Sequence, residues 1–461
     1  MNPTNGIRAA WRRTDLGGSL VRLAFFNSIL LNGVLALASV LTARWHLLGP
    51  PQLTSGLSVV FLWLFRMRQG DDSWRPMLHA LEVFHARLPI YQTVFFQDHD
   101  KFQYPLTSLL PLYGLQQWGM SNAGILTLMN ILTWMAFWLT LVLTVRIFLL
   151  TAKRNGILNE LKGPGAAAVA ASAGLLVLFF YPETYSYALG QMQTLLALMF
   201  AGAFYLWLTE QFTFAGALFG LMCLIKPQYS LFLLWFALRK KFSALASAGI
   251  VIALGWFAAG MIFGWHDQFA YLTVLGYISK HGESYWLNES MNGLLNHLLL
   301  NGPILNWVPD AFAPYNSFVY MASTLFSVGL IAVALFYPIE NKNRGGLVDL
   351  ATMAITATIA SPVAWHHHYA ILLPIFGYLA GAMSNSRYKM HLAIAFVLIS
   401  NSWSPLSLLA QVPGWNAVLS LRLFAALLLL YVLYRSVRAM HSREESLALE
   451  ETLPELACHP V

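Results

Sequence analysis

Residues 123–148 read AGILTLMNILTWMAFWLTLVLTVRIF, an apolar run in which Arg146 is the only charged residue. A helix needs about 20 mostly apolar residues to cross the hydrocarbon core of a bilayer, so this stretch predicts a membrane-spanning helix. Similar runs recur along the chain and indicate one membrane domain rather than several soluble ones. The other runs are 20–43, 166–182, 189–208, 243–264, 316–337, 347–362, 369–385, 390–403 and 415–435.

The composition agrees with a membrane protein. Of the 461 residues 58% are hydrophobic and only 10% are charged, whereas soluble domains carry about 25% charged residues. The net charge of +7 does not indicate nucleic-acid binding, because the basic residues lie in short clusters between apolar runs without interleaved aromatic residues. We therefore expect an all-α integral membrane protein, a polytopic bundle of about 10–12 transmembrane helices with re-entrant segments.

The basic clusters orient this bundle. They lie at 146–162, 239–241, 342–344, 387–389 and 435–443. Short loops rich in Lys and Arg stay in the cytoplasm, and placing every cluster there gives a consistent alternation with the N-terminus inside. The sequence thus predicts a single membrane domain over residues 1–435 and a polar cytoplasmic tail over 436–461, in the inner (cell) membrane.

Two segments interrupt the alternation. A single crossing of 212–238 would place Arg239 outside, and Pro227 breaks a helix because it lacks a backbone donor. We expect a hairpin with Lys226 at its tip; one kinked helix with a snorkelling lysine is the alternative. The run 54–67 is short for a crossing, and we expect a short interfacial or re-entrant helix there.

With this topology, unusual polar residues gather on the non-cytoplasmic side. The loop 68–122 carries Asp71 and Asp72, the hairpin tip carries Lys226, and the loop 265–315 carries further carboxylates. Three adjacent histidines, 366–368, follow a later helix. Each group has a plainer interpretation: solvated loop charge for the acids, structural histidines for the triple His, or an ion relay in a transporter. Convergence on one membrane face favours an active site at the lipid–water boundary.

The order of several short motifs resembles glycosyltransferase family 87, membrane mannosyltransferases with the C-type glycosyltransferase fold, over roughly residues 70–385. In that family an Asp opens the first outer loop, a Tyr follows, and Phe-x-Tyr-Pro enters the membrane. Asp72, Tyr91 and Phe102-Gln103-Tyr104-Pro105 stand in this order here. Asp71, directly before Asp72, leaves open which acid is the equivalent one.

Further motifs follow in family order. Gly190-Gln191 resembles the family's Gly-Gln, and Ile225-Lys226-Pro227 ends a Gly-rich helix as its Lys-Pro does. Asn288-Glu289-Ser290 is similar to Asn-Gln-Ser, with Glu in place of Gln. Ser361 to His367, SPVAWHH, is similar to Ser-Pro-x-Ser-Trp-x-His, with Ala364 at the second Ser.

The resemblance implies transfer of a sugar from a polyprenyl phosphate to a hydroxyl acceptor, with inversion of the anomeric configuration. Mannose is the first candidate for that sugar. A positioned carboxylate is the natural base for that hydroxyl, and we expect Asp72, with Asp71 as the second candidate. The leaving phosphate needs cationic or hydrogen-bonding donors. The expected donor-phosphate or sugar ligands are His366, His367, Lys226, Gln191, Asn288 and Tyr104.

No cofactor is expected, because phosphate is already a good leaving group; a divalent metal stays open. The expected partners are the lipid-linked donor, a glycolipid or glycan acceptor and membrane lipids. A flippase of lipid-linked oligosaccharide, or a secondary transporter, is the alternative function. That alternative predicts ionisable residues at the middle of the membrane and two pseudo-repeated halves.

Overall fold

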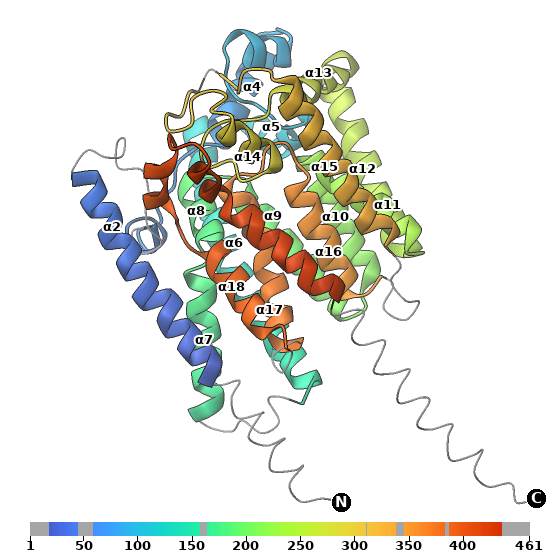
Figure 1. The fold of residues 1–461 in the computed structure, drawn as a ribbon. Helices are drawn as coiled ribbons and strands as arrows, with labels where there is room; N and C mark the ends of the chain where they lie inside the picture. The colour runs from blue at the N-terminus through green and yellow to red at the C-terminus, as the bar shows by residue number, and fades with distance from the viewer. Residues whose placement is uncertain are drawn as a thin grey trace, which may run out of the picture.

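The computed structural model describes residues 18–44, 59–156, 164–309, 311–337, 345–382 and 387–435. Within these ranges the chain is helical and contains no β-strand, which confirms the expected all-α class (Figure 1). The one isolated bridge pairs Asn288 with Trp365. The predicted cytoplasmic tail over 436–461 lies outside the described residues.

Five helices in the described ranges are long and apolar enough to cross a bilayer. They are Gly18–Leu41, Asn122–Arg154 (α6), Phe242–Phe263 (α12), Ser317–Phe336 (α15) and Trp415–Arg435. The first of these contains the π-helical η1 (Phe25–Leu31) and continues as α2 (Asn32–Arg44), and the last begins with η8 (Trp415–Ser420). All five coincide with apolar runs identified in the sequence.

A second set of apolar helices is shorter than a full span. These helices are Gln193–Leu208 (α9), Phe212–Ile225 (α10), Pro227–Leu238 (η5 and α11), Leu347–Ile359 (α16) and Lys389–Ser400 (α18). Together with α17 (Leu372–Ala382) they fill the interior of the bundle around the largest apolar core. The expected 10–12 helices thus include several that are short and broken; within the described residues five helices could cross on their own by length, or six spans if the bent pair over 165–189 counts as one.

Residues 212–238 form the predicted hairpin. The ring centroids of Phe219 in α10 and Phe232 in α11 lie 4.3 Å apart, and Phe219 also contacts Phe236 at 5.4 Å, so the two helices run antiparallel. Between them η5 (Pro227–Ser230) turns the chain, because Pro227 cannot donate to the preceding helical turn. Lys226 occupies the tip in an extended conformation.

A buried ion pair fixes the base of the hairpin. Arg239 Nε lies 2.6 Å from Asp349 Oδ2 in α16, and the Arg239 guanidinium also donates to the carbonyls of Ala334 and Leu335 at the end of α15. Trp235 donates to the same carboxylate. Since these groups satisfy one another away from water, the hairpin is held rigidly against α15 and α16.

The run 166–182 departs from its expected course. α7 (Pro164–Leu178) stops, and a second helix, α8 (Tyr181–Leu189), follows at an angle of 47°. Tyr181 and Pro182, at the end of this run, and Glu183, directly after it, begin α8 and are buried. Pro182 suits this place, because the first turn of a helix needs no donor from it.

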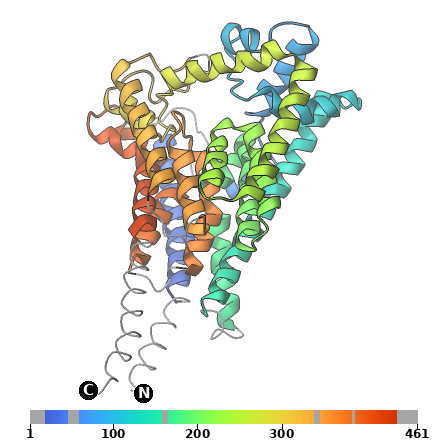
Figure 2. The same cartoon turned by 90° about the vertical axis from the view of Figure 1, so that its right-hand side faces the viewer.

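Helices also fill the two long loops, and they lie at one end of the bundle, hereafter the loop end. The first loop contains α4 (Trp74–His85), η3 (Gln92–Gln97), η4 (Leu106–Leu109) and α5 (Leu110–Gln117); the second contains α13 (Trp265–His281) and α14 (Met291–Leu298). Figure 2 shows α13 running across this end, over the tops of the membrane helices. The first-loop segments and α13 share a second apolar core that includes Trp74, Tyr91 and Phe102.

Those basic residues of the clusters that the structure describes lie at the opposite end. Arg154 donates to the carbonyl of Leu208, and Lys241 Nζ stands 4.3 Å from the centre of the Phe212 ring, so the ends of α6, α9 and α12 meet there. The run 54–67 is described from residue 59 on. This part holds η2 (Val60–Leu64), whose Val60 and Leu64 are buried, while the start of the predicted interfacial or re-entrant helix lies outside the described residues.

Candidate active site

Backbone pairing places the first acidic segment. The amides of Gly70, Asp72 and Ser73 donate to the carbonyls of residues 188, 189 and 190, at 2.8, 3.1 and 3.2 Å. Gly190 ends α8 in the left-handed conformation (φ +71°), and a Cβ there would lie 2.0 Å from the Gly70 carbonyl oxygen. Only glycine permits this close crossing, which sets Asp72 beside Gln191.

A chain of hydrogen bonds orients Asp72. Gln191 Nε2 donates to Asp72 Oδ2, while Gln191 Oε1 accepts from Ser73 Oγ (2.9 Å) and Tyr104 OH (3.3 Å). Two donors on the amide oxygen fix which way the Gln191 amide faces. The Met192 amide donates to Ser73 Oγ, and Tyr91 OH donates to the Tyr104 carbonyl. The Asp72 carboxylate is therefore held in one orientation.

Lys226 brings a buried cation to the same region. Its Nζ lies 2.8 Å from Gln193 Oε1 and 2.7 Å from His368 Nε2. No carboxylate of the described residues pairs with it, and burial lowers the pKa of Lys226 to about 7. A buried cation held by two neutral acceptors is poised for an anion that arrives from outside.

These groups share one cavity of about 1110 Å³. Six of the residues expected from the sequence line it: Asp72, Tyr104, Gln191, Lys226, His366 and His367. Apolar side chains from α11, α13, α15 and α16 complete one wall, namely Leu231, Leu275, Ile278, Ile331 and Ala357. The cavity therefore offers a carboxylate, a cation and an apolar surface to a single occupant.

Asp71 and Asn288 do not contribute to this lining. Asp71 is exposed next to Asp72, so of the two acids only Asp72 faces the cavity. Asn288 is fully buried and acts on the backbone: its Oδ1 accepts from the Ala364 amide (2.9 Å), and its Nδ2 donates to the carbonyls of Glu283 (2.8 Å) and Pro362 (3.3 Å). It holds the loop that carries the histidines rather than facing a substrate.

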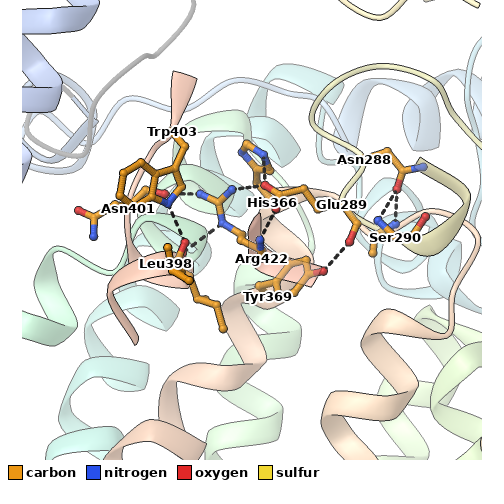
Figure 3. A network of polar contacts seen from close by, with 11 residues as sticks. Asn288, Glu289, Ser290, His366, Tyr369, Leu398, Asn401, Trp403 and Arg422 are labelled. Atoms are coloured by element: carbon orange, nitrogen blue, oxygen red, sulfur yellow. Dashed lines mark hydrogen bonds and ion pairs between the residues drawn. The ribbon is translucent and has the colours of Figure 1, made fainter. Parts of the chain in front are cut away.

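The adjacent Glu289 joins this loop to the last helix (Figure 3). Its carboxylate pairs with the Arg422 guanidinium and lies 2.7 Å from His366 Nε2. Arg422 Nε also donates to the Ile399 carbonyl (3.1 Å), and Tyr369 OH donates to the Glu289 carbonyl (2.6 Å). All four side chains are buried, so the network fixes His366 at the cavity wall.

The environment sets the charges in the site. Asp72 is accessible from the cavity, but protein surrounds it otherwise, and this burial raises its pKa; the Gln191 hydrogen bond partly opposes the rise. Burial lowers the pKa of His366 to about 4 and also lowers the pKa values of His367 and His368. At neutral pH the three histidines are therefore neutral and can act as hydrogen-bond donors, not as cations.

No group of three or more metal-binding side chains occurs within the part of the chain that the structure describes. Among the residues that line the cavity, His79 pairs with two carboxylates, at 3.3 Å from Asp98 and 3.2 Å from Asp100.

Sequence reasoning missed three supporting residues. Ser73 and Gln193 are ordinary polar residues that became visible only through their contacts with Gln191 and Lys226. Arg422 had a signal: it is an ionisable residue inside the apolar run 415–435, and such residues are costly unless they have a partner. Glu289, which departs from the family motif, is that partner.

The fold and the cavity define a polytopic membrane protein with a polar site at one end of its helical bundle. Residues 102–362, more than half of the chain, match the sequence profile of glycosyltransferase family 87. The chain belongs to this family.

Two curated proteins are similar in sequence, and each is named a polyprenol-phosphate-mannose-dependent alpha-(1-2)-phosphatidylinositol mannoside mannosyltransferase. The protein from Mycobacterium tuberculosis is 28% identical over 208 residues, 42% of this chain and 43% of the relative. The protein from Mycolicibacterium smegmatis is 27% identical over 204 residues, 42% and 44% respectively. The chain thus matches less than half the length of these relatives. No solved structure matches it.

Proposed function

We propose that this protein transfers a sugar from a polyprenyl phosphate to a hydroxyl acceptor. Mannose is the first candidate for that sugar. The observation that carries the proposal is that Asp72, Lys226 and an apolar wall line the same cavity. The family and the donor named for both relatives support it. The acceptor is a glycolipid or a glycan, by analogy with those names.

In the proposed reaction Asp72 is the general base. Its carboxylate takes the proton of the acceptor hydroxyl while that oxygen forms a bond to the anomeric carbon. The bond from this carbon to the phosphate oxygen breaks, and its electron pair leaves with the polyprenyl phosphate. Because the displacement is single, the anomeric configuration inverts. The fixed Gln191 amide keeps the carboxylate aimed, and the raised pKa of Asp72 makes it a stronger base than a solvated aspartate.

Lys226 would receive the phosphate. A cation in a site that excludes water stabilises charge that develops on the leaving group. His366 and His367, as neutral donors on the same wall, would bind the remaining phosphate oxygens or the sugar hydroxyls. The lipid chain would lie along the apolar wall of α11, α15 and α16. We propose no cofactor, since these groups supply the base and the anion binding that the reaction needs.

The proposed site faces the extracytoplasmic side of the cell membrane. The basic ends of α6, α11 and α18 lie away from the cavity, and loops rich in Lys and Arg stay in the cytoplasm. In this orientation the donor would be used after its phosphate has reached the outer leaflet.

The test is sugar transfer by the purified protein in detergent, with synthetic polyprenyl-phosphate-mannose and an extract of host membrane lipids. We expect transfer by the wild type, a loss of roughly 100-fold or more in Asp72→Asn, and near-normal transfer in Asp71→Asn. EDTA should leave the rate unchanged. Full activity in Asp72→Asn that retains its fold would overturn the assignment of the base. Movement of the donor across vesicles without transfer would favour a flippase.

A further inference from the structure

An aromatic cluster forms a separate part of the cavity wall at the loop end. The ring centroids of Trp307 and Trp365 lie 5.4 Å apart, and both rings contact Tyr285, at 5.5 and 6.2 Å. All three residues line the cavity. Trp307 is 39% exposed although it belongs to this packed group. A group of aromatic rings that is open to a cavity offers a flat apolar surface on which a ligand can stack.

Polar groups border the cluster directly. Lys101 Nζ stands 3.9 Å from the centre of the Trp307 ring and 2.9 Å from Glu283 Oε2. Asp98 and Asp100 line the cavity next to Lys101. Lys101 covers one face of the indole, so the remaining surface of Trp307 is the part open to a ligand in the cavity. Aromatic rings and charged hydrogen-bonding groups therefore meet at one edge of the cavity.

This combination suits a pyranose. One face of a sugar ring presents C–H bonds with a small positive charge, which the negative face of an indole attracts, while its rim of hydroxyls needs donors and acceptors. An alkyl chain would offer no hydrogen bonds to Lys101, Asp98 and Asp100, which line the cavity, and a phosphate would be repelled by Asp98 and Asp100. We propose that Trp307 and Trp365 bind a pyranose ring of the acceptor, with Lys101, which Glu283 holds in place, at its hydroxyls.

The proposal rests on the function proposed above, in which the donor occupies the part of the cavity lined by Lys226. There the apolar residues Leu231 and Ile331 come from membrane helices and Lys226 supplies the cation. Trp307 belongs to the loop between α14 and α15, and Lys101 to the loop before η4, both at the loop end. The acceptor sugar would thus approach from the loops and the donor from the membrane.

Binding is tested without catalysis. Saturation-transfer difference NMR would use the purified protein in detergent with methyl α-D-mannopyranoside, and with the corresponding glucoside and galactoside. We expect signal at the pyranose protons with wild type, a loss of at least threefold in Trp307→Ala, and retention in Trp307→Phe. Trp118, 87% exposed and outside the cavity lining, supplies the matched control, and Trp118→Ala should behave as wild type.

Equal signals from wild type and Trp307→Ala, or no signal with any of the three glycosides, would overturn the proposal. This readout stands even if the protein transfers no sugar from polyprenyl phosphate, so the two proposals can fail separately. Where transfer is observed, Trp307→Ala should raise the acceptor KM roughly 3–10-fold and leave the donor KM unchanged. A rise confined to the donor KM would assign the cluster to the donor and refute an acceptor subsite.

Discussion

Arg422 in the last helix and Glu289 before α14 form a buried ion pair although 133 residues separate them in the chain. Both the Arg422 amide and its guanidinium donate to the Glu289 carboxylate. The same carboxylate lies against His366 (Figure 3). The last helix, the second long loop and the histidine loop are therefore joined at one carboxylate.

Removing one partner should destabilise the protein strongly. Glu289→Ala leaves the Arg422 charge buried and unpaired, which costs about 3–5 kcal/mol, so we expect a large drop in the melting temperature in detergent. The double variant Glu289→Met with Arg422→Met removes both charges and should lose less than Glu289→Ala alone. Thermal unfolding followed by size-exclusion chromatography measures both, and a single variant as stable as wild type would contradict the role of the pair.

Lys226 should make the reaction rate fall at high pH, which would form the basic limb of the pH–rate profile. Phosphate binding needs the charged ammonium, and burial lowers the pKa of Lys226 to about 7, so donor binding should weaken as the pH rises through about 7. Lys226→Met should raise the donor KM roughly 10–100-fold and abolish this limb. Lys226→Arg keeps its charge and should extend activity to higher pH. A basic limb that persists in Lys226→Met would assign it to another group.

Gln191 should set the pH below which kcat/KM falls, that is, the acidic limb of the pH–rate profile. Its hydrogen bond lowers the pKa of Asp72, so Gln191→Leu should raise that pKa further. Because the base works only when deprotonated, the acidic limb of kcat/KM should move to higher pH, with a rate loss of roughly tenfold at the optimum. Gln211→Leu, at an exposed position outside the cavity, is the matched control. If the acidic limb of kcat/KM stays at the same pH in Gln191→Leu, then Gln191 does not set the pKa of the base.

Gly190 allows a test of the backbone crossing. In Gly190→Ala the new Cβ would meet the Gly70 carbonyl at 2.0 Å, so the segment carrying Asp72 must move and activity should fall by tenfold or more. Gly119 has a similar dihedral (φ +83°) but open space around it. Gly119→Ala should therefore show only backbone strain, about 1 kcal/mol, with activity kept. Comparable activity in the two alanine variants would argue against the crossing as the positioning element.

The sequence predicted the frame of the bundle and most of the cavity lining. Apolar run length located the long helices, and Pro227 together with the charge of Arg239 predicted the hairpin and hence the place of Lys226. Local patterns were informative wherever a helix faces lipid, because its residues are then almost all apolar. Asp72 and His366 could be placed together because both follow membrane helices that end on the same side.

The remaining features depend on contacts between distant segments. The sequence of α8, YPETYSYAL, is polar and aromatic, so it does not read as a membrane helix, yet its neighbours bury it almost completely. The inward role of Asn288 depends on Ala364 and Pro362, which no spacing rule brings beside it. The pairing of Arg422 with Glu289 is equally non-local, so the arginine could be flagged as unusual but its partner could not be named.

The clamp between Arg239 and Asp349 gives the hairpin a further property. With its base immobile, the height of the tip is the length of α10, whose 14 residues rise by roughly 21 Å. The hairpin then fixes how far the Lys226 ammonium stands from the clamped end of the bundle. A donor would be selected by the depth at which its phosphate rests in the bilayer, and its tail length would matter little. Insertion of one helical turn in α10 would shift that depth by about 5 Å.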